Sequence, residues 1–499
     1  MSQTLDHFKD YLKKLNTYNR VNTLLSWDMY TATPKLGYQG MADALAYFST
    51  EAFSLSTSDE LWKLLNALAA PEEYEKLDEV MQFTVRIMKR ELDESRRIPK
   101  DFYESFVVAR SASMQAWQEA KKNSDFSIFA PHLETMIEMT KQQCAYTHPG
   151  QDVYDTLLNQ YEEGMDSAAI DRVFAQMKEG LIPLVGQILE APQPDSEKFR
   201  GHYDPDAQKK VQDLLLDYIG FQHDAGVTAV SEHPFTLGFS RYDVRVTNHY
   251  YPDNPISAIF SAIHEGGHAI FEQNVNPALK GTPADDCRYM GIHESQSRFY
   301  ENILGRNKNF WIPIYSQVQE LLPGLKQISL DEFYREINHV QNSLIRTEAD
   351  EVTYGLHIII RYEIEQAIFR DHVPVSQLPA LWNQKMEEYL KITPPDDAQG
   401  ILQDMHWADG SFGYFPSYLL GNIYDGMFLE AINRDLGSLD SLLADGRIQE
   451  ITRWLNTQIH WYGGLRLPAQ VIQQVCGREL SAQPLLTYFR KKYTGIYQL

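Results

Sequence analysis

The chain has 499 residues, of which 43% are hydrophobic and 23% are charged. This balance is that of a globular protein, and no run of about 18 apolar residues is present, which argues against a membrane protein. The 68 acidic residues outnumber the 45 Lys and Arg residues, and the formal net charge of −23 argues against nucleic-acid binding.

The N-terminal segment bears on the cellular location of the protein, and the cysteines bear on whether thiolates could serve as metal ligands. The first 20 residues are polar and charged, whereas a secretion signal needs an apolar core of about 7 to 15 residues, so we expect a cytoplasmic location. Cys144, Cys287 and Cys476 lie far apart in the sequence and form no CxxC pair. This predicts neither a disulfide framework nor a thiolate metal site, so a metal here must use histidines and carboxylates.

Residues 5–190 have the pattern of successive amphipathic helices. Apolar residues recur at spacings of three and four, as in Phe8, Leu12 and Leu15. We expect breaks between helices at Ser58, Pro71, Pro99 and residues 120–124. Residues 191–206 are loop-like but too short for a flexible linker. The prediction is one domain over residues 1–499, with a helical N-terminal lobe (about 1–190) and a second lobe (about 207–430).

A strand or hairpin is predicted over residues 235–250. Val244 and Val246 alternate with Asp243, Arg245 and Thr247 at a period of two. The polar residues therefore share one face of the strand, which suits either solvent or the lining of a cleft.

The segment after this strand predicts a buried helix with metal-binding chemistry. Asn254 and Pro255 suit the start of a helix of about 20 residues that ends before Asn276. It contains His264-Glu265-Gly266-Gly267-His268, an HExxH pattern that places two imidazoles on one helix face, where they can share a metal. Glu265 is offset by about 100° around the helix, so it can act as a general base without binding the metal. The paired glycines indicate that something approaches the helix backbone closely, and small residues there suit a narrow cleft.

A catalytic zinc usually has three protein ligands, so a third must lie elsewhere. Phe271 and Asn274 stand where a metzincin has Gly and His, which excludes that class. A second helical stretch is predicted over residues 285–305, and Glu294 within it is the preferred third ligand. The spacing leaves Glu272, Glu301 and His293 as alternatives, with Glu272 better suited to a supporting role.

Several separated motifs resemble the carboxypeptidase Taq family of zinc metallocarboxypeptidases. They are Leu25-Ser26-Trp27-Asp28 with Pro34, His233-Pro234-Phe235, Asp243-x-Arg245-x-Thr247, the HExxH, His293-Glu294-Ser295-Gln296, Ile345-Arg346-x-x-Ala349-Asp350, and Gly400-x-x-Gln403-Asp404-x-His406-Trp407. The resemblance extends from near residue 20 to beyond residue 420, and no motif position departs from the pattern.

The resemblance implies a mainly helical gluzincin fold with a deep substrate groove, a small sheet beside the HExxH helix and a homodimer. It assigns His264, His268 and Glu294 as ligands of one Zn²⁺ per chain, for which Co²⁺ is an alternative, and Glu265 as the catalytic base. The expected reaction is hydrolysis that releases single amino acids from peptide C-termini, with broad side-chain tolerance and no covalent intermediate.

The remaining candidates follow from what this reaction needs. The tetrahedral oxyanion needs donors besides the metal, and by similarity to helical zinc peptidases we nominate Tyr418 and His406. The free C-terminal carboxylate suits a bidentate arginine. Arg346 is the first candidate, with a structural ion pair to Glu348 or Asp350 as the alternative, and Arg245 is the second.

Further motif residues have two interpretations each. Asp243 and Thr247 either position the substrate backbone or support the sheet, and His233 is either a substrate contact or a turn residue. Asp404 and Asp350 either orient ligand imidazoles or cap turns, whereas Trp407 and Phe235 are expected in the core.

Two other functions remain open from the sequence. One is a helical zinc oligopeptidase or dipeptidyl carboxypeptidase, and the other is a non-catalytic scaffold stabilised by metal. Glu265 argues against the scaffold, because a structural site needs no base.

Overall fold

The computed structural model describes residues 3–499, and most of these residues are helical. The first helices are α1 (Gln3–Thr31), α2 (Tyr38–Ser56), α3 (Asp59–Leu68), α4 (Pro71–Tyr74), α5 (Glu79–Arg97), α6 (Lys100–Asn123), α7 (Phe126–Thr147), α8 (Val153–Tyr161), α9 (Ser167–Glu190) and α10 (Pro205–Ile219). The helices predicted over residues 5–190 are therefore present. Ser58 caps α3 through the Leu61 amide, Pro71 begins α4, and α6 ends at Asn123.

The helices that follow the sheet carry the candidate site and the C-terminal part of the fold. They are α11 (Pro255–Gln273), α12 (Met290–Arg298), α13 (Lys308–Trp311), α14 (Tyr315–Leu321), α15 (Leu330–Glu336), α16 (Tyr354–Phe369), α17 (Leu378–Leu390), α18 (His406–Asp409), α19 (Phe415–Leu436), α20 (Leu439–Ala444), α21 (Ile448–Gln458), α22 (Pro468–Cys476) and α23 (Gln483–Tyr497). A π-helical turn, η5 (Phe299–Gly305), continues α12. The helix predicted over residues 285–305 therefore begins later than expected, at Met290.

The sheet has three strands, β1 (Gly226–Val230), β2 (Thr236–Ser240) and β3 (Asp243–Asn248), in the order β1-β3-β2. β2 and β3 form the predicted antiparallel hairpin, whereas β1 pairs with β3 in parallel and was not predicted. β1 lacks an alternating apolar pattern, and only its pairing with β3 defines it. The sheet packs against α11, which places it beside the HExxH motif.

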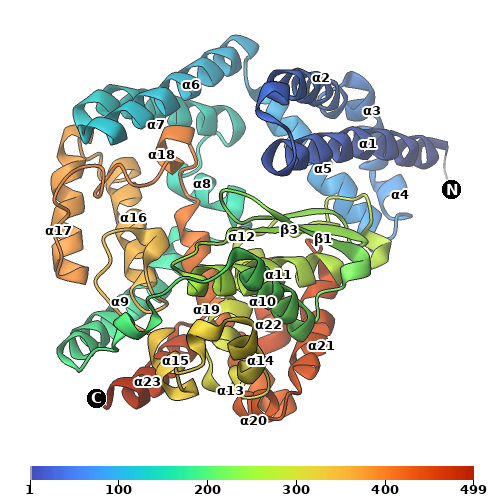
Figure 1. The fold of residues 1–499 in the computed structure, drawn as a ribbon. Helices are drawn as coiled ribbons and strands as arrows, with labels where there is room; N and C mark the ends of the chain where they lie inside the picture. The colour runs from blue at the N-terminus through green and yellow to red at the C-terminus, as the bar shows by residue number, and fades with distance from the viewer. Residues whose placement is uncertain (1–2) are drawn as a thin grey trace.

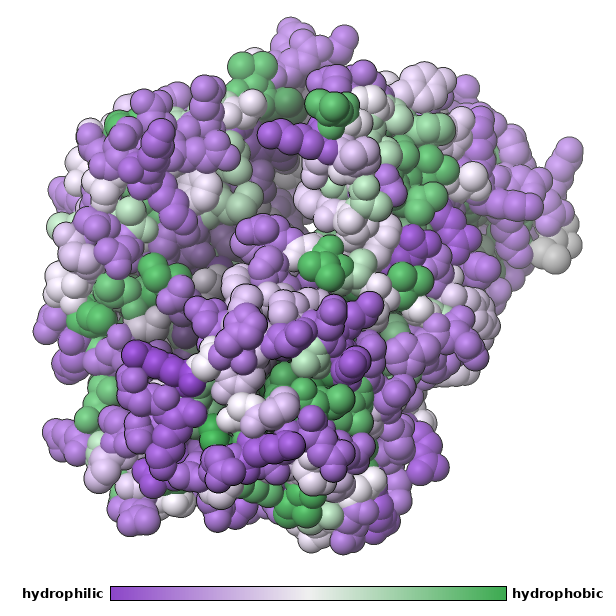
Figure 2. Space-filling view, viewed as in Figure 1, coloured by the Kyte–Doolittle hydropathy of each residue, from purple (hydrophilic) through white to green (hydrophobic). Residues whose placement is uncertain are grey.

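The helices surround a hollow above the HExxH helix. In Figure 1, α1 to α3 lie on one side, α6, α7 and α17 lie on the other, and α11 and α12 lie below, between them. The space-filling view is hollowed between these two groups of helices (Figure 2). The fold is thus the mainly helical, grooved architecture that was predicted.

Apolar packing divides the molecule into two cores. The smaller core joins α1, α3 and α5, and includes Phe8, Leu65 and Val85. The larger core extends from Phe83 to Tyr497. Among residues 3–499, no helix combines the length and the apolar character needed to cross a membrane.

Candidate active site

The HExxH helix α11 is capped at its N-terminus and is buried along most of its length. The Asn254 side chain accepts a hydrogen bond from the Ser257 amide, and Pro255 occupies the first turn, as predicted. The rings of His264 and His268 lie one turn apart, with centroids separated by 5.0 Å. The local sequence therefore sets the spacing of the two imidazoles.

The paired glycines of the motif allow other helices to approach α11. A Cβ atom on Gly267 would lie 2.7 Å from the Gln296 carbonyl oxygen and 2.8 Å from the Ser297 Cα in α12. A Cβ atom on Gly266 would lie 2.6 Å from the tip of Ile219 in α10. The close approach inferred from the glycines is therefore helix packing rather than the lining of a narrow cleft.

Glu294 lies opposite both histidines, in the position of a third ligand. One of its carboxylate oxygens, Oε2, is 3.9 Å from His264 Nε2 and 3.6 Å from His268 Nε2. Ligand atoms of the three residues all lie within 4.8 Å of one another. Two ligand atoms bound at 2.0–2.1 Å to a tetrahedral metal are separated by about 3.4 Å, so the donor set fits a single divalent ion.

Glu301, on the π-helical turn, orients one of these histidines. Its carboxylate lies 2.8 Å from His264 Nδ1, which leaves Nε2 directed toward Glu294. Burial by itself raises the pKa of Glu301. Arg298 and His264 have the larger, opposite effect, and together they lower this pKa to about 2. Arg298 also bonds Glu294 at 2.8 Å. From the sequence, Glu301 was considered only as a metal ligand. Its spacing of three residues from Arg298 is the signal that could have indicated an ion pair between these two residues.

Glu265 lies near His264 and Glu294 and is hydrogen-bonded to the sheet. The Thr236 hydroxyl lies 2.7 Å from Glu265 Oε2, and burial raises the pKa of this carboxyl group. Thr236, in β2, was missed in the sequence because a single hydroxyl next to the His-Pro-Phe motif carries no pattern.

The other two alternatives for the third ligand bond one another. His293 Nε2 lies 2.8 Å from a Glu272 oxygen, and the His293 ring stacks on His268 with centroids 4.5 Å apart. Together with Asp286 they form a second group of potential ligand atoms, apart from the His264, His268 and Glu294 set.

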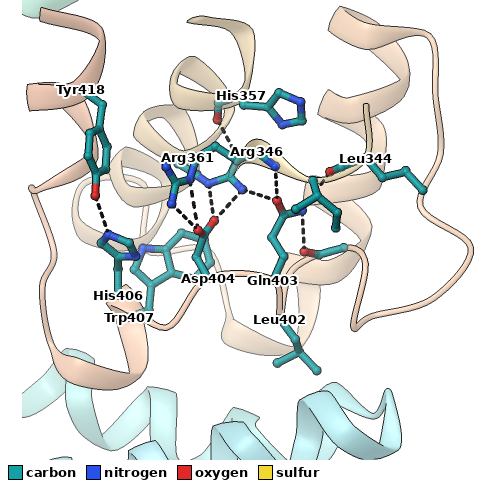
Figure 3. Close-up of polar contacts among 12 residues, drawn as sticks. Leu344, Arg346, His357, Arg361, Leu402, Gln403, Asp404, His406, Trp407 and Tyr418 are labelled. Atoms are coloured by element: carbon teal, nitrogen blue, oxygen red, sulfur yellow. Dashed lines mark hydrogen bonds and ion pairs between the residues drawn. The ribbon is translucent and has the colours of Figure 1, made fainter. Parts of the chain in front are cut away.

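Arg346 lies in a buried polar cluster that Figure 3 shows in detail. Its guanidinium contacts Asp404 Oδ1 at 2.9 Å and 3.1 Å, and its Nη1 donates to the Tyr354 hydroxyl at 3.2 Å. The ion pair given as the alternative for Arg346 is present, but its partner is Asp404 rather than Glu348 or Asp350, and Arg346 lies in a short 3-10 turn. Arg361 contacts the same carboxylate, and this residue was missed because it lies outside the motifs.

Tyr418 and His406 meet beside this cluster. The Tyr418 hydroxyl is 3.3 Å from His406 Nε2, and the Arg346 guanidinium lies over the Tyr418 ring at 5.0 Å. Burial lowers the pKa of His406 to about 4, so its ring is neutral at pH 7. Burial raises the pKa of Tyr418, and the neighbouring Tyr414, Tyr354 and Glu294 raise it further. Tyr418 thus lies within electrostatic range of both Glu294 and Arg346.

The polar residues of the strand β3 are engaged with one another and with the sheet. Arg245 forms a bidentate pair with Asp243, at 2.9 Å and 3.1 Å, and stacks over Phe239. Thr247 is 1% exposed, and its hydroxyl lies 2.7 Å from the Ser231 hydroxyl. These contacts are those expected of residues that support the sheet.

The remaining motif residues lie in different surroundings. His233 is exposed. The Asp350 carboxylate accepts hydrogen bonds from the Val352 and Thr353 amides, so it caps a turn. Trp407 is buried and donates to Glu365, as expected of a core residue, whereas Phe235 is only partly buried, against Trp27.

Comparison with known proteins gives matches over almost the whole chain. The family described as Carboxypeptidase Taq (M32) metallopeptidase matches residues 7–493. Carboxypeptidase 1 of Bacillus subtilis is 43% identical over 497 residues, which cover 99% of this chain and 98% of that protein. Thermostable carboxypeptidase 1 of Thermus thermophilus is 34% identical, covering 96% of each chain. The crystal structure of an M32 carboxypeptidase from Deinococcus radiodurans superposes with a TM-score of 0.96 at 29% identity, covering 100% of both chains.

Proposed function

The chain belongs to the carboxypeptidase Taq (M32) metallopeptidase family, and from this premise we propose that it releases single amino acids, one after another, from peptide C-termini with a bound zinc ion. As a metallocarboxypeptidase it acts on peptides and uses a divalent metal. The observation that carries the proposal is the convergence of His264, His268 and Glu294, because two imidazoles and one carboxylate directed at one point are the ligand set of a catalytic zinc site.

We propose that these three residues hold the metal and that Glu265 is the base. When bound, the metal supplies a Lewis acid that activates water and polarises the scissile carbonyl. Glu265 accepts a proton and returns it to the leaving amine, and the Thr236 hydroxyl, 2.7 Å away, fixes the orientation of its carboxylate. Glu301 holds the His264 ring with Nε2 directed to the ligand group.

Two further roles concern the substrate. Tyr418 and neutral His406 are proposed as donors to the oxyanion, which is consistent with their mutual contact and with the proximity of Tyr418 to Glu294. Arg346 is proposed to bind the terminal carboxylate, supported by the position of its guanidinium over the Tyr418 ring. The contacts of Arg245, Asp243 and Thr247 favour a supporting role in the sheet over substrate binding.

Several further properties belong to the same proposal. Zinc is favoured by the two imidazoles and one carboxylate, with Co²⁺ as a substitute. We retain the single catalytic domain, the cytoplasmic location, the homodimer, the broad side-chain tolerance and the lack of nucleic-acid and membrane partners as predictions. The three cysteines are free, which is compatible with a reducing compartment.

Mass spectrometry of digestion products tests the proposal directly. An N-blocked peptide and its C-terminally amidated twin are incubated with the metal-loaded enzyme, with and without a chelator. We expect stepwise loss of single residues from the free acid alone, and none with the chelator. Dipeptide or internal products from both peptides would establish an oligopeptidase or dipeptidyl carboxypeptidase instead.

A further inference from the structure

Two arginines share one carboxylate in the cluster around Arg346. Arg346 bonds Asp404 Oδ1, whereas Arg361 bonds the other oxygen of the same group, with its Nε at 2.6 Å (Figure 3). Arg361 is fully buried, and the side chains of Arg346 and Asp404 are 8% and 12% exposed. Because two positive charges face one negative charge, this buried group carries an excess of one positive charge.

The other partners in the cluster do not supply the missing negative charge. Gln403 Oε1 accepts from the Arg346 amide and from Arg361 Nη2, and the His357 carbonyl accepts from Arg361 Nη1. The Gln403 amide group is itself held by the Leu344, Gln399 and Gly400 carbonyls, so its oxygen stays directed at the arginines.

A second carboxylate, that of Glu365, lies within electrostatic range of Arg361 but forms its hydrogen bonds with other groups. Glu365, also on α16, accepts hydrogen bonds from Tyr154, Trp407 and the Gly413 amide rather than from Arg361. On its other side, Arg346 donates from Nη1 to the Tyr354 hydroxyl, and its guanidinium lies over the Tyr418 ring at 5.0 Å and the Phe415 ring at 5.8 Å, neither of which carries a negative charge. The part of the cluster that is not neutralised therefore faces Tyr418, the residue proposed to contact the reacting carbonyl.

From this arrangement we infer that Arg361 is a positioning residue for substrate recognition. It holds one oxygen of Asp404, so that Asp404 does not neutralise Arg346 and the charge of Arg346 remains available to the C-terminal carboxylate of the peptide. Arg361 does not touch the substrate itself. The inference rests on the proposed function, since it assigns the excess charge to the carboxylate of that same reaction.

Charge-changing variants test this role. In Arg361→Gln the cluster becomes neutral, because Asp404 then pairs with Arg346 alone. We expect KM for an N-blocked free-acid peptide to rise about tenfold or more, with kcat changed by less than about threefold. In the double variant Arg361→Gln/Asp404→Asn the excess of one positive charge returns, and KM is expected to fall again relative to Arg361→Gln. The matched control is Arg370→Gln at the end of the same helix, where Arg370 pairs with Asp152 and Asp155.

If Arg361 only supports the fold, the KM values of the single and double variants should be in the opposite order. Removing Asp404 as well would then add damage, and the double variant would have a higher KM than Arg361→Gln. Thermal midpoints and metal content are measured for each variant. An Arg361→Lys variant keeps the positive charge but not the three separate donors, so its KM should lie between those of the wild type and Arg361→Gln. If Arg361→Lys instead matches Arg361→Gln, the charge argument is wrong.

The single variant Asp404→Asn tests the inference while Arg361 remains in place. We expect an N-acetylated amino acid, which presents a free carboxylate, to inhibit this variant at least as strongly as the wild type. Weaker inhibition would overturn the inference. If the wild-type enzyme cleaves the amidated peptide as readily as the free acid, the proposed function fails, and this result is independent of the Arg361 variants.

Discussion

His264 and Glu301 are joined by a 2.8 Å contact between the imidazole Nδ1 and a carboxylate oxygen, across 37 residues of sequence. The contact fixes which ring nitrogen is directed at Glu294, because Nδ1 is already used. His268 has no such anchor: its Nδ1 has no hydrogen-bond partner within residues 3–499, and its ring is held by stacking on His293. The two histidines are therefore supported by different means.

The first prediction concerns this anchor. Glu301→Gln should weaken metal affinity about 10- to 100-fold, since the His264 ring loses its charged partner and a negative charge leaves the site. Competition with a chromophoric chelator measures the affinity. Glu320→Gln, which alters an exposed residue, is the control, and equal affinities in the two variants would show that Glu301 does not orient the ligand.

Glu265 has a role that can be separated from metal binding. Glu265→Gln should lower kcat at least about 10²-fold, because amide groups do not accept the proton that the reaction must move. Metal content, measured by atomic absorption, should be unchanged. Retained turnover with the metal in place would exclude Glu265 as the base.

The two glycines of the motif should differ in their tolerance of alanine. Gly267→Ala places a methyl group against the backbone of α12, so it should displace Glu294, weaken metal binding and cost about 1 to 3 kcal/mol of stability. Gly266→Ala meets the tips of Ile219 and Leu216, which can move. Both changes raise helix propensity equally, so their difference isolates the contact with α12. The idea fails if Gly266→Ala binds metal as poorly as Gly267→Ala.

Recognition of the terminal carboxylate should depend on Arg346 far more than on Arg245. Arg346→Gln should lower kcat/KM for a free-acid peptide about 100-fold and remove the preference for acid over amide. Arg245→Gln should change this preference little, because Asp243 already occupies the Arg245 guanidinium. The opposite ranking in steady-state kinetics would assign the carboxylate to Arg245.

His357 should make the protein sensitive to acid. Burial, together with Arg361 and Arg346, lowers the pKa of this histidine to about 3, whereas the unfolded value is near 6.5. Between these values the unfolded chain binds the additional proton, so stability falls as the pH is lowered from about 6.5, by at most about 1.4 kcal/mol per pH unit. Above pH 6.5 this group has no effect.

Urea unfolding of wild type and His357→Gln between pH 4 and 7 measures the effect. The variant should lose less stability per pH unit, whatever its absolute stability, because glutamine does not titrate. His202→Gln, which alters an exposed histidine, should behave as the wild type does. Parallel pH profiles for the wild type and His357→Gln would contradict the assignment.

Features that depend on a few neighbouring residues were predictable from the sequence. The helices of residues 5–190, the cap at Asn254, the β2–β3 hairpin and the spacing of His264 and His268 follow from periodicity and capping. The separated motifs predicted the family, which the matches over residues 7–493 establish. Local backbone geometry accounts for the helices, the cap and the hairpin. The family assignment depended instead on comparing the separated motifs with the family pattern.

Tertiary packing alone decided which charged groups face one another. Asp404 lies between Arg346 and Arg361, 58 and 43 residues away, and the nearer Glu348 and Asp350 make no ion pair with Arg346. Glu301 became the partner of His264 because α12 and its π-helical turn pack on α11 at Gly267. Sequence spacing determines which side chains are neighbours within one helix or strand. A buried charge needs an opposite charge beside it, and which residue supplies that charge depends on how a second element packs.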